Sequence, residues 1–242
     1  MRVRLRFVEL GKVRFVSHRD VARIWERALR RAGLPAASTE GFSPRPKVHF
    51  GLALSTGHES LGEYLDVDLR PEAVDGLDVD GLPALLSPLL PPGIDVEAAA
   101  VVDRRQDSLQ QAVTSCTWEI EALGADPATA AASVAGALAA DELPVTRVRK
   151  GKERVDDVRP AVLGLEVVGP TPPERPTPGV VLLAELATQP RGLRPTELLT
   201  AVDPTWVEGR VVRLHQWIEV DGARQEPLPA ATRPARAEVR AS

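Results

Sequence analysis

The strict alternation of charged and apolar side chains at the start of the chain is the strongest constraint on its fold. Within Arg2–Val8, arginines at positions 2, 4 and 6 alternate with apolar residues at positions 3, 5 and 7. Successive side chains of a strand point to opposite faces, so this segment predicts a half-buried β-strand. One face holds Arg2, Arg4 and Arg6, and the other holds Val3, Leu5 and Phe7. The sequence therefore predicts a sheet with one face on a core and one basic face.

The segment that follows carries the signals of a helix. Ser17 and Asp20 have the spacing of a capping box, in which the serine oxygen accepts a hydrogen bond from a backbone N–H of the first turn. Gly33, with Pro35 beyond it, predicts that the helix ends near Ala32. The apolar stripe of this helix consists of Val21, Ile24, Trp25, Ala28 and Ala32.

The later periodic segments give the first half of the chain the order β-α-β-β-α-β, which is the ferredoxin-like pattern. There we expect strands at Lys47–Leu54, Gly62–Leu69 and Ile94–Val102, and a short helix at Gly81–Leu90. After a polar link at Asp103–Gln110 the pattern roughly repeats. In the repeat we expect strands at Thr114–Ala122, Leu163–Val168, Val180–Ala187 and Val211–Val220, helices at Pro127–Ala140 and Pro195–Val202, and a hairpin across Lys150–Lys152.

The predicted fold is therefore α+β, with two tandem ferredoxin-like domains and antiparallel sheets. We expect a basic first domain over residues 1–103 and a second domain over residues 113–221. The last segment, residues 222–242, is rich in Pro, Ala and Arg and has few apolar residues to bury. It is predicted to be a disordered tail.

Composition excludes several classes of site. The single cysteine, Cys116, rules out an internal disulfide and a multi-cysteine zinc or iron–sulfur site, so no metal or cofactor is expected. Cysteine usage of this kind fits a reducing compartment, and we expect a cytoplasmic protein. No apolar run approaches the roughly 18 residues of a membrane span, so no membrane association is expected.

The distribution of charge along the chain is strongly asymmetric. Residues 1–50 carry 12 Lys and Arg against 4 Asp and Glu, a balance of +8, whereas the remainder carries 18 against 30, a balance of −12. One interpretation is that the first half binds a polyanion. The other is that the two halves neutralise each other across an interface.

The predicted first helix carries a stripe of arginines. Four of them recur at every fourth position and therefore line one face, where like charges repel by a few tenths of a kcal/mol per pair. The stripe consists of Arg19, Arg23, Arg27 and Arg31, with Arg30 beside it. Phosphates of RNA would remove the repulsion and release counterions. The alternative is a solvated face that Asp20 and Glu26 partly neutralise.

The loop Gly41–Lys47 is the second candidate for anion binding. Two prolines stiffen it, and Ser43, Arg45 and Lys47 supply hydrogen-bond donors. A connection this dense in polar groups favours a binding function, although it matches no phosphate-loop fingerprint. A rigid structural turn is the alternative.

The basic face of the first strand is the third candidate. In the expected topology it lies beside Tyr64, Asp66 and Asp68, which predicts a ladder of cross-strand ion pairs. The alternative is a polar platform for RNA. A standard RNA-recognition motif would place two or three stacking aromatics there, and Tyr64 is the one that the pattern supplies.

The histidines suggest one catalytic hypothesis. Their spacing matches no metal-binding motif. His18 at the helix start, together with Glu63 or Asp66, is the best combination for general acid–base catalysis. Cys116 lies on a predicted strand and is expected to be a buried apolar residue.

Several motifs resemble one bacterial family, the radical-SAM-linked domain of unknown function in its stand-alone form. They are RFVSH (Arg14–His18), ERALRRAGLP (Glu26–Pro35), GFSPRPK (Gly41–Lys47) and GEYLDV (Gly62–Val67), with weaker likenesses at Arg147–Pro160 and Leu193–Leu199. The resemblance covers most of residues 1–220. Arg19 departs from it, since an apolar residue is usual there.

The resemblance implies no catalytic residue, because the family has no agreed activity. It implies association with a radical SAM enzyme, which would itself hold the cluster, or with a neighbouring E/G-type ribonuclease. Our leading hypothesis is an RNA-binding accessory protein in RNA modification or processing. The alternatives are a protein-binding subunit that docks such an enzyme, and an uncharacterised acid–base enzyme.

Overall fold

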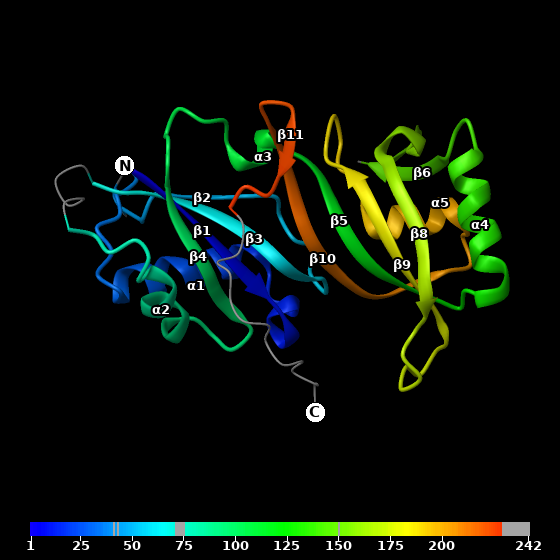
Figure 1. Cartoon of the computed structure of the whole chain (residues 1–242), viewed down its shortest axis with the longest axis horizontal. Coiled ribbons are helices and arrows are strands. Elements are labelled where there is room, and N and C mark those ends of the chain that lie inside the picture. The colour runs from blue at the N-terminus through cyan, green and yellow to red at the C-terminus, as the bar shows by residue number, and fades with distance from the viewer. Residues whose placement is uncertain (41, 43, 71–75, 150, 229–242) are drawn as a thin grey trace.

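The computed structural model describes residues 1–40, 42, 44–70, 76–149 and 151–228 (Figure 1). The helices of this part of the chain are α1 (His18–Arg31), α2 (Leu82–Leu86), α3 (Leu109–Ala112), α4 (Pro127–Ala139) and α5 (Pro195–Val202). The strands of the large sheet are β1 (Arg2–Glu9), β2 (Val48–Phe50), β3 (Glu59–Asp68), β4 (Ile94–Val102), β5 (Val113–Leu123), β8 (Val162–Pro170), β9 (Gly179–Ala187), β10 (Val207–Val220) and β11 (Ala223–Gln225). A separate hairpin consists of β6 (Pro144–Arg149) and β7 (Lys152–Asp157).

The predicted α+β class is confirmed, and a single mixed sheet of nine strands runs through the described chain. We call residues 1–102 the first half and residues 113–220 the second half. The order is β4-β1-β3 in the first half and β10-β5-β9-β8 in the second, and β2 also pairs with β3. Neighbouring strands are antiparallel except β3 and β10, which run parallel where the halves meet. The sheet therefore differs from the predicted antiparallel sheets at this junction.

Each half of the sheet packs its helices over its own core (Figure 1). In the first half the core contains Leu5 and Leu65 from the sheet and Trp25 and Leu86 from helices α1 and α2. In the second half a separate cluster joins β5, β9 and β10 to α4 and α5. The charge alternation of β1 thus places its apolar face on the helices and its arginines on the opposite side of the sheet.

The seam between the halves is held by ion pairs as well as by backbone pairing. Arg210 on β10 reaches Glu59 on β3 at 2.7 Å, and Arg213 reaches Glu63 at 3.1 Å. Arg213 also donates to the carbonyl oxygens of Leu52 and Ala53 at 3.1 Å each. This contact explains why the strand predicted over Lys47–Leu54 ends at Phe50, since the chain leaves the sheet there to cover Arg213.

The prediction of a tail that is disordered from residue 222 is wrong for its first residues. Strand β11 pairs with β10, and Glu226 then bonds to Arg6 at 2.6 Å and to His215 at 2.9 Å. Segment 223–228 therefore packs on the sheet through hydrogen bonds and charge, despite its few apolar side chains. Residues 229–242 lie outside the described part of the chain, and the predicted domain boundaries stay a prediction.

Candidate nucleic-acid interface

Helix α1 forms where its capping signals predict. The backbone N–H of Asp20 donates to the Ser17 side chain at 3.2 Å, and the helix ends just before Gly33, whose φ of 66° suits glycine. Its apolar stripe is buried against the first-half core, which turns the arginine stripe to solvent. We call this exposed set the basic face of α1, and it consists of Arg19, Arg23, Arg27, Arg30 and Arg31.

Few carboxylates neutralise the basic face of α1. Arg23 pairs with Asp20 at 2.9 Å, and Arg27 donates to a backbone carbonyl of its own helix at 3.2 Å. Within the described residues, Arg30 and Arg31 make no ion pair. The face therefore keeps an excess of positive charge that an external anion can neutralise.

Arg45 of the loop Gly41–Lys47, which we call the basic loop, lies beside this face. The Arg45 guanidinium lies 3.7 Å from the Glu26 carboxylate of α1, so it extends the basic surface across one edge of the helix. Ser43, the other donor predicted here, lies outside the described residues.

Exposed aromatic side chains occur in the segments before and after α1, and the charge pattern of the sequence does not indicate them. Phe42 is fully exposed in the basic loop, and Phe15 is 63% exposed two residues before the N-cap of α1. The Arg14 guanidinium lies 4.6 Å from the centre of the Phe15 ring. Exposed rings among arginines are the combination that single-stranded nucleic acids use for base stacking and phosphate contact. The sequence does contain this signal, because the motifs RFVSH and GFSPRPK each include one phenylalanine, Phe15 and Phe42.

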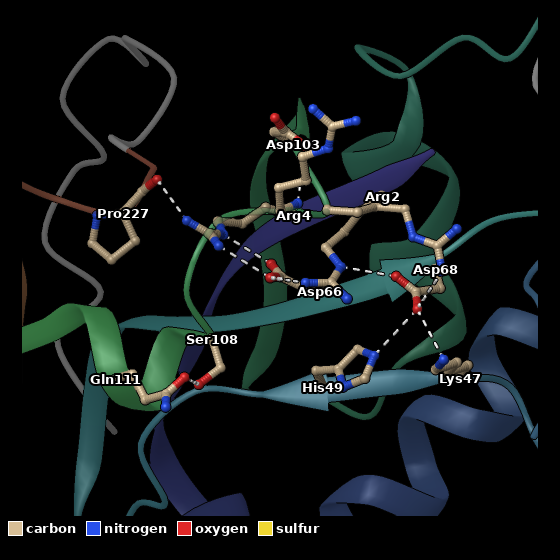
Figure 2. A network of polar contacts seen from close by, with 12 residues as sticks. Arg2, Arg4, Lys47, His49, Asp66, Asp68, Asp103, Ser108, Gln111 and Pro227 are labelled. Carbon is tan, nitrogen blue, oxygen red and sulfur yellow. Dashed lines mark hydrogen bonds and ion pairs between the residues drawn. The ribbon is translucent and has the colours of Figure 1, made fainter. Parts of the chain in front are cut away.

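Lys47 belongs to a different surface. Its ammonium group lies 3.6 Å from Asp68, on the face of the sheet that points away from α1 (Figure 2). His49 of β2 and Lys47, just before the strand, both reach Asp68 on that face, and strand alternation places Val48 on the α1 side. The structure therefore separates the two basic residues of the predicted loop site, Arg45 and Lys47, onto opposite faces.

Asp68 is the centre of a polar network on this face. Arg2 donates to it at 2.8 Å, and Lys47 and His49 approach within 3.4–3.6 Å (Figure 2). Arg104 lies 3.3 Å from the same carboxylate. Burial opposes ionisation of Asp68, but hydrogen bonds from Arg2 and His49 outweigh it and hold the pKa at about 2. The carboxylate thus stays charged. Arg2, Arg4, Lys47 and Arg104 place four positive charges around the two carboxylates of Asp66 and Asp68, which leaves a local excess of positive charge.

The arginines of β1 form the predicted ladder of cross-strand ion pairs. Arg4 makes two contacts with Asp66, and Arg6 donates to the Tyr64 hydroxyl at 2.9 Å. The carbonyl of Pro227 accepts from Arg4, so segment 223–228 covers this part of the sheet (Figure 2). The alternative of an open RNA platform at these arginines is wrong, because Arg4 and Arg6 are buried, the Arg2 side chain is only 13% exposed, and all three are paired.

The residues proposed for acid–base catalysis do not come together. His18 is exposed and packs edge-on against Phe50, with ring centres 5.2 Å apart. Asp66 belongs to the ion-pair ladder, and Glu63 is buried at the seam beside Arg213. Burial raises the pKa of Glu63, and the charge of Arg213 opposes that shift. The predicted combination therefore lacks the shared geometry that proton transfer requires.

Two further features bear on the class of protein. Among the described residues there is no group of three or more His, Cys, Asp or Glu side chains that could hold a metal ion. None of the described helices is long and apolar enough to cross a membrane.

These observations define an α+β protein with one large mixed sheet, a basic helix on one side of it and a buried ion-pair network on the other. The chain belongs to a bacterial family described as "uncharacterized protein conserved in bacteria (DUF2344)", whose model matches residues 2–195. The matched range includes α1, the basic loop and β3. No protein with a curated function matches the chain.

Proposed function

We propose that this protein is an RNA-binding accessory protein in RNA modification or processing, and that it works with a radical SAM enzyme. The observation that carries the proposal is the basic face of α1, where five exposed arginines lie with few carboxylate partners. The association with a radical SAM enzyme rests on the sequence motifs, above all RFVSH and GFSPRPK.

Phosphate contact is the chemistry that fits this surface best. Arginine forks match the geometry of phosphate oxygens, and each neutralised phosphate releases counterions. An extended surface of this kind suits a backbone with repeated charge. Arg45 extends the surface beside Glu26, and the exposed Phe15 and Phe42 can stack on unpaired bases. Single-stranded RNA is therefore the ligand we propose.

We also infer that the two halves are tandem ferredoxin-like units. The strand order β4-β1-β3-β2 of the first half corresponds to the order β10-β5-β9-β8 of the second. Among the strands of the large sheet, the first and third of each half are antiparallel neighbours, β1 with β3 and β5 with β9. Superposition of the two halves in an experimentally determined structure tests this inference. A difference in the path of the crossover connections would contradict it.

Binding of labelled single-stranded RNA, followed by fluorescence anisotropy at two salt concentrations, tests the proposed function. The decisive variant changes Arg23, Arg27, Arg30 and Arg31 to Gln, which removes four charges while keeping good helix formers. We expect wild-type affinity to fall with salt, and the slope of log affinity against log salt to fall by about 0.7 for each lost contact. Wild-type protein that binds no RNA would contradict the proposal.

Affinity purification from native lysate completes the test. We expect the wild-type chain to retain RNA together with a radical SAM enzyme, and the four-arginine variant to lose the RNA. A ribonuclease or radical SAM partner retained without RNA by both proteins would favour a protein-docking subunit instead.

A further inference from the structure

A cavity of about 550 Å³ lies at the seam between the two halves. The first half contributes the loop Leu52–Thr56, and the second half contributes residues of β5 and β9, the segment 192–195 and Arg213 of β10. Its volume falls within the roughly 300–1,000 Å³ of small-molecule sites. Neither half encloses the cavity without the other, so any site here depends on the joined sheet.

The walls of the cavity are mostly apolar. Leu52 and Leu54 line one side, and Leu186 and Leu193 line the other. Cys116 belongs to the same lining, and burial raises the pKa of its thiol to about 11. The thiol therefore stays neutral near pH 7 and acts as a further apolar surface. Apolar side chains of both halves would therefore contact a ligand in this cavity.

A few polar groups are fixed on this apolar lining. Trp118 lines the cavity, and its indole N–H donates to none of the described residues; Arg213, also in the lining, has a buried Nε without an acceptor there. The Arg213 guanidinium lies 4.8 Å from the centre of the Trp118 ring. Its contacts with Glu63 and two backbone carbonyls hold it there. A bound group that accepts a hydrogen bond would satisfy the indole donor at little cost in reorganisation.

A cation lies at the rim. Arg194 lines the cavity and is exposed, and it makes no ion pair within the described part of the chain. It is the N-cap residue of α5, whose N-terminus is capped by the Glu197 carboxylate, so the positive charge at the rim comes from the Arg194 side chain. The hydroxyls of Ser55 and Thr56 lie on the side of the lining that the first half supplies. The rim therefore favours an anionic group next to the apolar interior.

We propose that this seam cavity binds one nucleotide unit, with its base between the apolar walls and its phosphate at Arg194. A nucleobase is planar and carries acceptors for the indole N–H, and its phosphate is the anion that the rim favours. The choice of a nucleotide among planar anions rests on the proposed RNA binding. The bound nucleotide can be a free nucleoside monophosphate or an unpaired nucleotide of an RNA. Both offer the same base and phosphate to the cavity.

Calorimetric titration of the whole chain tests the proposal, with each of the four nucleoside monophosphates, the matching nucleosides and inorganic phosphate as ligands. We expect one saturable site per chain for at least one monophosphate. The nucleoside should bind about tenfold more weakly, because it lacks the charge-assisted contact. Inorganic phosphate should not compete at equal concentration, because it cannot fill the apolar part of the cavity.

Two variants test whether the monophosphate binds in this cavity. Arg194→Ala changes an exposed side chain, so it should stay folded and lose about tenfold in monophosphate affinity. Trp118→Phe keeps a ring but removes the N–H donor, and it should lose a few-fold. Arg154→Ala, which removes an exposed arginine of the β6–β7 hairpin, is the matched control and should bind like wild type. No saturable monophosphate binding, or binding that Arg194→Ala leaves unchanged, would overturn the proposal.

The same titrations separate this site from the proposed interface on α1. Arg30→Gln/Arg31→Gln should keep its monophosphate binding, because these residues do not line the cavity. Monophosphate binding without any RNA binding would overturn the proposed function and assign the cavity to free nucleotides. RNA binding without monophosphate binding would overturn the cavity proposal alone. Displacement of a bound RNA by the monophosphate would identify RNA as the source of the unit.

Discussion

The Arg4 guanidinium forms a two-point ion pair with the Asp66 carboxylate, from Nε to Oδ1 at 2.8 Å and from the terminal nitrogen to Oδ2 at 3.0 Å. The pair links β1 to β3, and both side chains are buried. A basic residue that looks available for RNA in the sequence is therefore a structural element of the sheet.

The first prediction follows from this pair. Asp66→Asn should lower the free energy of unfolding by about 3 kcal/mol, because it leaves the Arg4 charge buried without its partner. Denaturant unfolding followed by circular dichroism measures the change. Arg154→Ala breaks an exposed ion pair and should cost no more than about 0.5 kcal/mol. Equal stability of the two variants would show that the ladder contributes little.

Glu9 predicts how stability depends on pH. Burial, reinforced by the charge of Glu63, raises its pKa to about 7. The folded state therefore binds this proton more tightly than the unfolded state does. The extra free energy of unfolding that the proton provides is present at low pH. It should be lost as pH rises from about 4.5 to about 7, by roughly 3 kcal/mol for a shift of this size.

Denaturant unfolding of Glu9→Gln tests this dependence. The variant carries no ionisable group at that position, so it should lose less stability than wild type between pH of about 5 and about 8. Glu142→Gln changes an exposed carboxylate and should follow the wild-type profile. A Glu9→Gln profile that runs parallel to that of wild type would contradict the assignment.

The contacts of segment 223–228 predict the effect of shortening the chain. A chain that stops after Gly222 loses β11 and the two contacts of Glu226, to Arg6 and His215. Its melting temperature should fall by about 5 °C, as expected for a loss of 1–2 kcal/mol in a chain of this size. A chain that stops after Leu228 keeps these contacts and should melt like wild type. Identical melting of both shortened chains would refute the docking.

Arg45 and Lys47 should differ in their effect on RNA binding. Arg45 lies beside α1, whereas Lys47 lies on the opposite face of the sheet. If the basic face of α1 is the interface, Arg45→Ala should reduce the salt slope by about 0.7, and Lys47→Ala should leave it unchanged. Anisotropy titrations at two salt concentrations distinguish the two variants. A reversed result would place RNA on the face around Asp68.

Local signals in the sequence predicted many of the elements well. Helix α5 and strand β4 begin and end as the pattern predicts, and Ser17 caps α1. The alternation of β1 also predicted the arginine–aspartate ladder, because the pleat fixes which side chains share a face. Such features depend on neighbours within one strand or one turn.

Features that depend on contacts between distant segments were not predicted. The parallel pairing of β3 with β10 and the position of Arg213 join residues about 150 positions apart, and no local period encodes them. Segment 223–228 reads as a tail because its contacts with Arg4 and Arg6 are polar and long-range. Sequence distance groups Lys47 with Arg45, although Arg45 lies beside Glu26 of α1 and Lys47 reaches Asp68 on the other side of the sheet.

The salt dependence of RNA binding by Arg30→Gln/Arg31→Gln tests the central claim most directly. Its matched control is Arg154→Gln/Arg224→Gln, which removes two exposed arginines away from α1 and changes the net charge equally. We predict that wild type and control share one slope of log affinity against log salt, and that the α1 variant has a slope smaller by about 1.4. Equal slopes for all three proteins, or wild-type protein that binds no single-stranded RNA, would contradict the assignment of the basic face of α1 as an RNA interface.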